Sequence, residues 1–167
     1  MGSTPENLQA AFAGESQANR RYLYFAEQAE KEGHPQIARL FRAVAEAETV
    51  HARNHLGVLG GIGPTKDNVE TAIKGEHYEF MEMYPGFIEE AKAEGDSGAV
   101  AVFDYANKVE KIHHGLYERA RSSLEGGQPL EDKAYSVCQV CGYTVAGEIS
   151  EKCPICGATR DKFKRVE

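Results

Sequence analysis

The chain has 167 residues, with 26 Asp and Glu against 19 Lys and Arg, so its formal net charge at pH 7 is −7. This acidic balance argues against nucleic acid as a partner, and no apolar run approaches the ~18 residues of a membrane span. Because the N-terminus shows no signal peptide, we expect a cytoplasmic protein with no membrane contact. Its length suits one ordinary domain and a small one.

Two helices are predicted to open the chain. Thr4 is the expected N-cap of the first helix, with Pro5 at its first position, and the helix ends near Gly33. The chain restarts at Pro35 as a second helix, which runs to about Gly60. Apolar residues recur in the second helix with the helical period, which indicates that one of its faces is buried.

The second helix carries a carboxylate and an imidazole three residues apart, Glu48 and His51. Residues at this spacing share a helix face, so both side chains can point at one metal ion. Glu15 on the first helix is a third candidate ligand. Carboxylate and imidazole suit iron or manganese, although one such pair alone is weak evidence, because charged residues at helical spacing usually form a solvated face.

A crossover at residues 61–64 leads to a third predicted helix at about residues 67–94. This helix is one residue longer than its counterpart in the first half, and Pro85 in its interior cannot donate a backbone N–H to the preceding turn. An inserted residue in a continuous helix is commonly absorbed as a π-bulge. We therefore predict a π-bulge or a kink between about Glu79 and Pro85.

The third and fourth helices repeat the ligand pattern. Glu110 and His113 on the fourth helix have the same three-residue spacing, and Glu76 on the third helix is the counterpart of Glu15. Glu79 adds a carboxylate on the face of Glu76 for which the first half has no equivalent. The predicted site is therefore asymmetric, with seven candidate ligands.

The two halves form an internal repeat. Glu15 precedes Glu48 by 33 residues and Glu76 precedes Glu110 by 34, and each set lies at matching offsets from its own turn. In antiparallel helices equal offsets mean equal heights, so the six candidate ligands other than Glu79 share one level. A repeat of two helices cannot bury its apolar stripe alone. The pattern predicts a ferritin-like four-helix bundle that holds two metal ions.

The last part of the chain, residues 134–167, is expected to form a small β-rich domain behind a helical domain of residues 1–133. It holds two C-x2-C pairs separated by 11 residues, a spacing typical of metal knuckles and not of a disulfide framework. Iron and zinc fit this spacing equally well, and the need of a di-iron site for electrons favours iron. The four cysteines are Cys138, Cys141, Cys153 and Cys156.

Together these motifs resemble the rubrerythrin family over essentially the whole chain. The spacer between the two knuckles is shorter than in free-standing rubredoxins, as is usual for the rubrerythrin C-terminal domain. The resemblance implies a di-iron bundle, a rubredoxin-like iron domain and the reduction of hydrogen peroxide to water. The motifs that carry it are Gly14-Glu15, Glu48-x-x-His51, Gly75-Glu76-x-x-Glu79, Met83-Tyr84-Pro85, Glu110-x-x-His113 and both cysteine knuckles.

The resemblance also implies a role for each ligand. Glu48 and Glu110 would bridge two iron ions. Glu79 and His51 would exchange as ligands of one iron, the carboxylate in the diferric state and the imidazole in the diferrous state, as the harder charge of Fe(III) favours. The remaining ligands would each hold a single ion: Glu15, Glu76 and His113.

Tyr22 and Tyr84 follow Glu15 and Glu76 by about two helical turns and lie on the same face. This position suits hydrogen bonding to the ligands or to peroxide, which would make both tyrosines catalytic residues. A role as core aromatic residues with a satisfied hydroxyl fits them equally well.

Two other functions use the same residues. The bundle could belong to a ferroxidase that stores or sequesters iron, or the chain could be a binding module with zinc in the cysteine site and no turnover. Storage needs no one-electron donor, so the four-cysteine domain argues against it, and Glu79 favours a peroxidase. A reductase or a rubredoxin would then supply electrons.

The linker leads us to expect a head-to-tail homodimer. His113 lies 12 residues before the end of its helix near Glu125, which corresponds to ~18 Å. The linker at residues 128–133 is short and is expected to allow little folding back. The cysteine-bound iron of a chain would then lie too far from its own di-iron site, and a neighbouring chain would have to supply the electrons.

Overall fold

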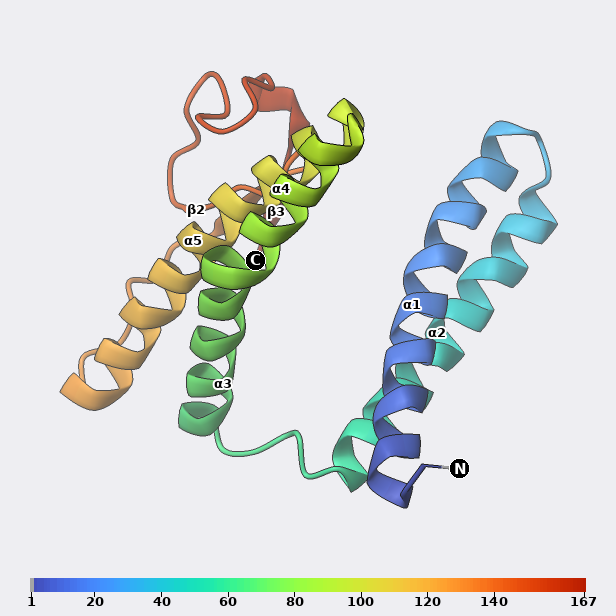
Figure 1. The fold of residues 1–167 in the computed structure, drawn as a ribbon, viewed down its shortest axis with the longest axis horizontal. Coiled ribbons are helices and arrows are strands. Elements are labelled where there is room, and N and C mark those ends of the chain that lie inside the picture. The colour runs from blue at the N-terminus through green and yellow to red at the C-terminus, as the bar shows by residue number, and fades with distance from the viewer. Residues whose placement is uncertain (1) are drawn as a thin grey trace. The chain divides into compact units, whose positions relative to one another are not determined.

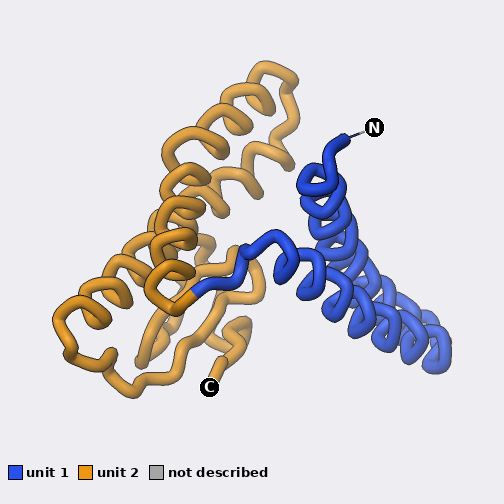
Figure 2. The backbone as a smooth tube through the Cα atoms, turned by 90° about the horizontal axis from the view of Figure 1, so that it is seen from below, with its two compact units in different colours: residues 1–63 blue, residues 64–167 orange. Residues whose placement is uncertain are grey.

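The structure is a computed structural model that describes residues 2–167. It is mainly α-helical and ends in a small antiparallel sheet, which confirms the predicted fold class. The chain separates into two compact units, of which one ends at Gly63 and the other spans Pro64–Glu167 (Figure 2). Within residues 2–167, no helix combines the length and the apolar character needed to cross a membrane.

The first unit is a hairpin of α1 (Thr4–Lys31) and α2 (Pro35–Val58) (Figure 1). The predicted N-cap of α1 is one residue off, because Ser3 caps the helix and Thr4 is its first residue. The Ser3 hydroxyl accepts from the Glu6 amide, and the Glu6 carboxylate accepts from the Ser3 amide at 2.6 Å. This reciprocal capping box satisfies two backbone donors that the first turn leaves free.

Small residues bring α1 and α2 close together. Ala26 and Ala29 of α1 meet Ala38 of α2 in a buried cluster, with Phe41 packed against it. Alanine has no side chain beyond Cβ, so the helix backbones approach closely and no side-chain entropy is lost on burial. The hairpin therefore has a narrow, well-defined interface.

A buried polar contact sets the register of this hairpin. The side-chain amide of Asn19 donates to the carbonyl oxygen of Ala45 at 2.7 Å and to the hydroxyl of Thr49 at 2.9 Å. Asn19 lies one turn after Glu15, and Thr49 directly follows Glu48. The bond therefore joins the two helices at the level of the candidate ligands.

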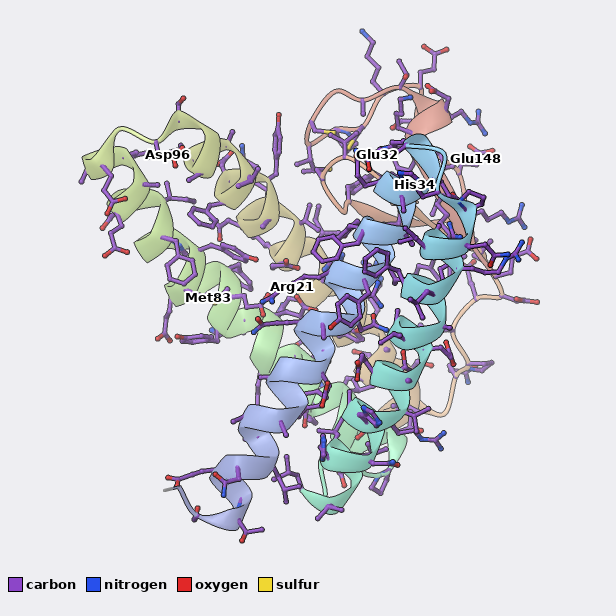
Figure 3. The ribbon with its side chains drawn as sticks, turned by 90° about the vertical axis from the view of Figure 1, so that its right-hand side faces the viewer. Arg21, Glu32, His34, Met83, Asp96 and Glu148 are labelled. Atoms are coloured by element: carbon purple, nitrogen blue, oxygen red, sulfur yellow. The ribbon has the colours of Figure 1, made fainter. Side chains whose placement is uncertain are left out.

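The second unit begins with α3 (Thr65–Tyr78), the π-helical segment η1 (Glu79–Met83) and α4 (Tyr84–Glu94). Met83, which ends η1, is labelled in Figure 3. The amide of Tyr84 donates to the carbonyl of Glu79, five residues back, so the π turn takes up the extra residue of this helix. The predicted bulge is confirmed.

The turn after α4 leads into α5 (Ser97–Gly126), which packs along both α3 and α4. Gly95 adopts a φ of 76°, a left-handed conformation that glycine tolerates best. The Asp96 carboxylate then accepts from the amide of Ala99 at 2.9 Å and caps α5.

The C-terminal sheet belongs to this second unit. Its central strand β1 (Tyr135–Cys138) pairs antiparallel with β2 (Thr144–Ala146) on one side and with β3 (Phe163–Val166) on the other. Strand β2 also contacts α5. The sheet is therefore folded back onto the helices.

The Asn19 contact can be tested by replacing Asn19 with Leu in the metal-free protein. Two hydrogen bonds across the hairpin are lost, so the free energy of unfolding should fall by about 1–3 kcal/mol. Urea unfolding followed by circular dichroism measures the change. Gln17→Leu, at an exposed position of the same helix, is the matched control, and equal stability of the two variants would contradict this role of Asn19.

Candidate metal centres

The first unit gathers one triad of candidate ligands from two helices. Glu15 comes from α1, and Glu48 and His51 come from α2; their ligand atoms lie within 4.8 Å of one another. The Nδ1 atom of His51 is 2.8 Å from a carboxylate oxygen of Glu48. The imidazole side chain is 54% exposed, whereas that of Glu48 is 13% exposed.

The second unit repeats this triad with Glu76 from α3 and with Glu110 and His113 from α5, again within 4.8 Å. The Nδ1 atom of His113 is 2.7 Å from Glu110 and 3.8 Å from Glu76. Its side chain is only 25% exposed. The same three-residue spacing therefore produces the same local geometry twice, but in a more enclosed setting in the second triad.

Crowding of the carboxyl groups raises pKa values in the second triad. Burial, a hydrogen bond with Glu110 and the negative charge of Glu110 raise the pKa of Glu76 from 4.5 to about 7. The hydrogen bond with Glu110 also raises the pKa of His113. In the absence of a metal ion the cluster relieves its negative charge by holding protons. A bound cation would replace those protons, and the oxygen and nitrogen donors suit iron.

Glu79 and Tyr84 lie at the two ends of the π turn, close to the second triad. Burial and then the charge of Glu110 raise the pKa of Glu79. Burial, followed by the charges of Glu110, Glu79 and Glu76, raises the pKa of the Tyr84 hydroxyl. Glu79 is not a member of the compact triad, but both side chains lie within its electrostatic field.

Tyr22 has a different environment. Its ring packs near Phe25 and Phe41, with centroid separations of 6.3 and 6.1 Å. This cluster lies within the hairpin of the first unit and fits the aromatic-core interpretation of Tyr22.

The four cysteine sulfurs form a compact cluster within 4.8 Å. The Sγ atoms of Cys138 and Cys156 are 3.7 Å apart, and those of Cys141 and Cys153 are 3.6 Å apart. A tetrahedral ion with bonds of about 2.3 Å to sulfur separates its ligands by about 3.8 Å. The cluster therefore fits one tetrahedral metal ion, and these separations exclude disulfides.

Both knuckles have the same backbone geometry. Gly142 and Gly157, which follow the second cysteine of each pair, have φ angles of 83° and 77°. Their amides donate to the carbonyls of Cys138 and Cys153, at 2.9 Å in each case. Glycine adopts such angles with the least strain, so each knuckle closes in a tight turn.

The expectation that residues 128–133 cannot fold the cysteine domain back is wrong. The Nε2 atom of His113 is 2.9 Å from the hydroxyl of Thr144 in β2. A Cβ built on Gly142 would lie 3.7 Å from the Val109 side chain, one turn before His113 on α5. The first cysteine knuckle therefore rests directly on the helix that carries the second triad.

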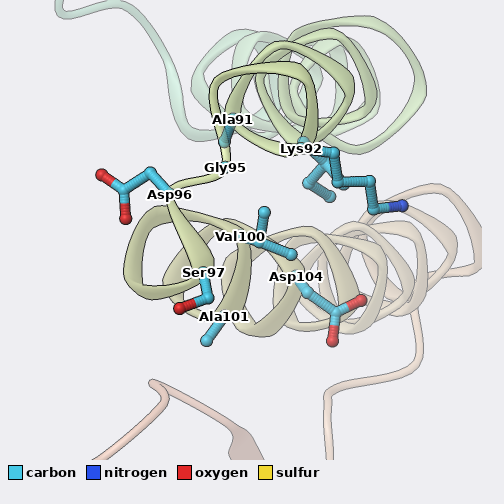
Figure 4. A pocket seen from close by; sticks show the side chains of 9 residues that line it. Ala91, Lys92, Gly95, Asp96, Ser97, Val100, Ala101 and Asp104 are labelled. Carbon is cyan, nitrogen blue, oxygen red and sulfur yellow. The ribbon is translucent and has the colours of Figure 1, made fainter.

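A cavity of about 530 Å³ adjoins this contact. It is reached by Glu76 and His113 of the second triad and by Thr144 of the sheet, and the rest of its wall is largely apolar. A separate cavity of about 440 Å³ lies at the turn between α4 and α5 (Figure 4). None of the candidate ligands lines this second cavity, so it is not part of the metal site.

Sequence reasoning missed two residues next to the triads. Asn19 lies one turn from Glu15 on the same face of the helix, and a polar residue in a core-facing stripe is a signal that could have revealed it. Thr144 has no comparable signal, because its partner His113 is 31 residues away in a different kind of secondary structure.

Two family models match the chain in tandem. The model described as "Rubrerythrin" matches residues 6–121, and the one described as "Rubrerythrin, rubredoxin-like domain" matches residues 137–164. Rubrerythrin-2 of Clostridium acetobutylicum is 39% identical over 96% of this chain and 95% of its own. Nigerythrin of Nitratidesulfovibrio vulgaris is also 39% identical, over 98% of this chain and 86% of its own.

Solved structures of nigerythrin are similar as well. The one titled "Partially Reduced State of Nigerythrin" has a TM-score of 0.59 at 37% identity and covers 99% of this chain and 88% of its own. These matches agree with the two ligand triads and the cysteine cluster, which are the donor groups of the di-iron carboxylate site and of the rubredoxin-like iron site. The chain belongs to the rubrerythrin family.

Proposed function

We propose that this chain is a non-haem di-iron peroxidase that reduces hydrogen peroxide to water. Electrons would enter through the four-cysteine iron site from an external reductase or rubredoxin. The observation that carries the proposal is the combination in one chain of two carboxylate–imidazole triads with a compact cluster of four cysteines. The first donor set suits a reactive pair of iron ions, and the second suits a one-electron carrier.

The relatives support redox-active iron. One nigerythrin structure is titled "Fully reduced state of nigerythrin (all ferrous)" and another is titled "Mixed valant state of nigerythrin". Iron in that protein therefore takes more than one oxidation state. A site that cycles between oxidation states favours turnover over storage, and it also favours iron over zinc, which has no redox chemistry.

The proposed reaction converts one hydrogen peroxide, two protons and two electrons into two water molecules. A pair of ferrous ions would supply both electrons to the O–O bond. Glu48 and Glu110 are proposed as bridging ligands, and Glu15 and Glu76 as ligands of one ion each. His51 and His113 complete the six-ligand set, with one imidazole for each ion.

Glu79 and Tyr84 are proposed to act at the reacting end of this site. Glu79 would exchange with His51 as a ligand; the exposed imidazole of His51 has room to move, and the π turn carries Glu79 on a backbone that departs from the regular helix. Tyr84 keeps its proton because burial raises the pKa of its hydroxyl, so the hydroxyl can donate a hydrogen bond to peroxide. Tyr22 is proposed as its counterpart in the first half.

We further propose a head-to-tail homodimer as the active form. Each helical pair carries only one triad, and large apolar side chains are exposed on both pairs, among them Tyr24, Leu40 and Val50 in the first and Met81 and Val102 in the second. We propose that another helix pair or another subunit covers these side chains. Packing in a bundle and a dimer would bury them.

Replacement of Glu79 by Ala tests the proposed ligand exchange. Peroxide reduction should slow by on the order of tenfold or more, comparable with the loss of a group that supports a metal site. Folding and iron content should be retained, because six other ligands remain. Glu82→Ala removes an exposed carboxylate from the same π turn and is the matched control. A full peroxidase rate in Glu79→Ala would contradict the exchange.

Replacement of Cys141 by Ser tests whether the cysteine site only relays electrons while the di-iron site reacts with peroxide. Turnover with an external donor should stop, whereas a di-iron site that has been reduced chemically should still be oxidised once by peroxide. Stopped-flow absorbance distinguishes these two reactions. Gln139→Ala, in the same knuckle, controls for damage to the fold, and loss of the single oxidation in a folded Cys141→Ser protein would count against the proposal.

The carboxyl groups of the second triad predict that the free energy of unfolding of the metal-free protein depends on pH. The pKa of Glu76 is raised to about 7 in the folded state, so the folded protein binds this proton more tightly than the unfolded chain. The contribution of Glu76 to the free energy of unfolding is therefore fully present below about pH 4.5, and it is lost as the pH rises towards 7. Because solvent screens the partly exposed carboxyl, we expect a loss of about 1 kcal/mol.

Urea unfolding of the metal-free protein at pH 5 and at pH 7.5 measures this loss. Glu76→Gln cannot ionise and should flatten the dependence, whereas Glu94→Gln, an exposed carboxyl at the far end of the same helix, should leave it unchanged. An unaltered pH dependence in Glu76→Gln would refute the assignment of the raised pKa to this residue.

A further inference from the structure

We propose that each di-iron site is shared between two chains: the α1–α2 hairpin of one chain packs against α3, α4 and α5 of a second copy, which returns the same exchange. The proposal deepens the proposed function, on which it rests, because it takes the two triads as the two halves of one di-iron site. It starts from the length of the connection between the two compact units, residues 59–64.

A ferritin-like bundle needs a long connection between its second and third helices. The two hairpins of such a bundle run in opposite directions, so one crossover carries the chain along the length of the bundle. Helix α2 continues for 10 residues beyond Glu48 to Val58, which is ~15 Å of helix. Helix α3 begins at Thr65, 11 residues before Glu76, which is ~17 Å. With both triads at one level, the crossover has to span ~32 Å along the bundle.

The connection in this chain is too short for that span. Residues 59–64 and their junctions to the two helices reach ~25 Å when fully extended. Part of this length is already used, because the amides of Gly60 and Gly61 donate to carbonyls in the last turn of α2 at 3.0 and 2.9 Å. Only residues 61–64 then remain to extend, and they reach ~18 Å. Both values are well below the distance that an in-chain crossover has to cover.

A second copy of the chain removes this constraint. The connection then has only to lead from one bundle into the neighbouring one, where its hairpin pairs in the direction that a ferritin-like bundle needs. The exchange is reciprocal, so a two-fold dimer closes with two complete sites and no unpaired hairpin. A short connection could instead join neighbouring helices of a simple up-down-up-down bundle, but the ligand pattern and the family are those of the ferritin-like class.

The first hairpin is built to move as one body. The buried cluster of Ala26, Ala29 and Ala38 and the bonds of the Asn19 amide hold α1 and α2 together without help from the rest of the chain. Each unit by itself gathers only three ligands within 4.8 Å. A di-iron site of six ligands is therefore incomplete until a hairpin meets a second unit, and in the exchanged dimer the partner supplies three of the six.

Equivalent aromatic clusters mark the faces that the exchanged hairpins would cover. Each unit has one tyrosine and two phenylalanines packed together between its triad and its hairpin turn. The clusters are Tyr22, Phe25 and Phe41 in the first unit and Tyr84, Phe87 and Phe103 in the second. In both, the middle ring is only half buried: Phe25 is 47% exposed and Phe87 is 41% exposed. A hairpin of the second copy would bury both rings.

Complementation between two metal-site variants tests the exchange without a measurement of activity. One chain carries Glu48→Ala and the other carries Glu110→Ala, with different affinity tags, and mixed dimers are isolated after refolding together. Each variant alone should lose iron from the helical sites, because every site lacks one of its two central glutamates. The mixed dimer should regain about half of the native iron content of the helical sites, because one of its two sites joins two intact triads.

A mixture of Glu15→Ala with Glu48→Ala is the matched control. Both changes fall in the first triad, so no pairing of hairpins restores a complete site and no iron should be regained. The absorption of the cysteine-bound iron and the circular dichroism should remain native in every mixture. A bundle closed within one chain predicts no recovery in either mixture. Absence of recovery in mixed dimers confirmed by mass, or a monomeric native protein with full iron content, would overturn the exchange.

Lengthening the connection tests whether its short reach is the cause. An insertion of about 20 Gly and Ser residues after Gly61 raises the root-mean-square span to roughly 28 Å, which makes closure within one chain accessible. In this background the Glu48→Ala and Glu110→Ala mixture should lose its iron recovery. The same insertion after Glu131, in the second linker, should leave the recovery intact. Full recovery with the insertion after Gly61 would show that the reach of residues 59–64 does not enforce the exchange.

The iron measurements separate this proposal from the proposed function. If the native protein bound iron but did not reduce peroxide, the peroxidase assignment would fail, and the iron content of the mixed dimers would still decide between shared and in-chain sites. If the native protein reduced peroxide but the mixed dimers regained no iron, the peroxidase assignment would stand and the exchange would fall.

Discussion

The crowding of acidic side chains and of thiols into compact clusters governs the chemistry of this chain. In the second triad two carboxyl groups approach closely enough that the pKa of Glu76 rises to about 7, and in the C-terminal domain four sulfurs meet within 4.8 Å. Such clusters are costly without cations. The fold therefore has to hold these groups together until metal binds. In the first unit, the small-residue packing of α1 and α2 and the buried Asn19 contact hold the two helices together beside Glu15 and Glu48.

Helix α5 connects the two kinds of metal site. It supplies Glu110 and His113 to the second triad, and on the same face it presents Val109 to the first cysteine knuckle. The hydroxyl of Thr144 in β2 also lies 2.9 Å from the Nε2 atom of His113 on this helix. The second triad and the first cysteine knuckle thus meet on one helix.

The internal repeat is nearly symmetric, but the two halves differ in the surroundings of their triads. Both triads have the same imidazole–carboxylate contact. The second half adds the π turn with Glu79 and Tyr84, and it also adds the cysteine domain that covers His113. The imidazole of the second triad is therefore more enclosed than that of the first.

Much of the local structure and many of the candidate ligands could be predicted from the spacing of residues in the sequence. Helical periodicity predicts which residues share a face, so each Glu-x-x-His pair and the π turn follow from local rules that act within one or two helical turns, whereas the third ligand of each triad follows from the internal repeat. The N-cap is off by one residue because Ser3 and Thr4 are both good caps and only the position of Glu6 decides between them. The position of the cysteine domain is different in kind. A linker of six residues allows many directions, and the one adopted depends on the packing of Gly142 near Val109 and on the bond between Thr144 and His113. These contacts join residues about 30 positions apart, and no local pattern encodes them, so only the tertiary structure could reveal them.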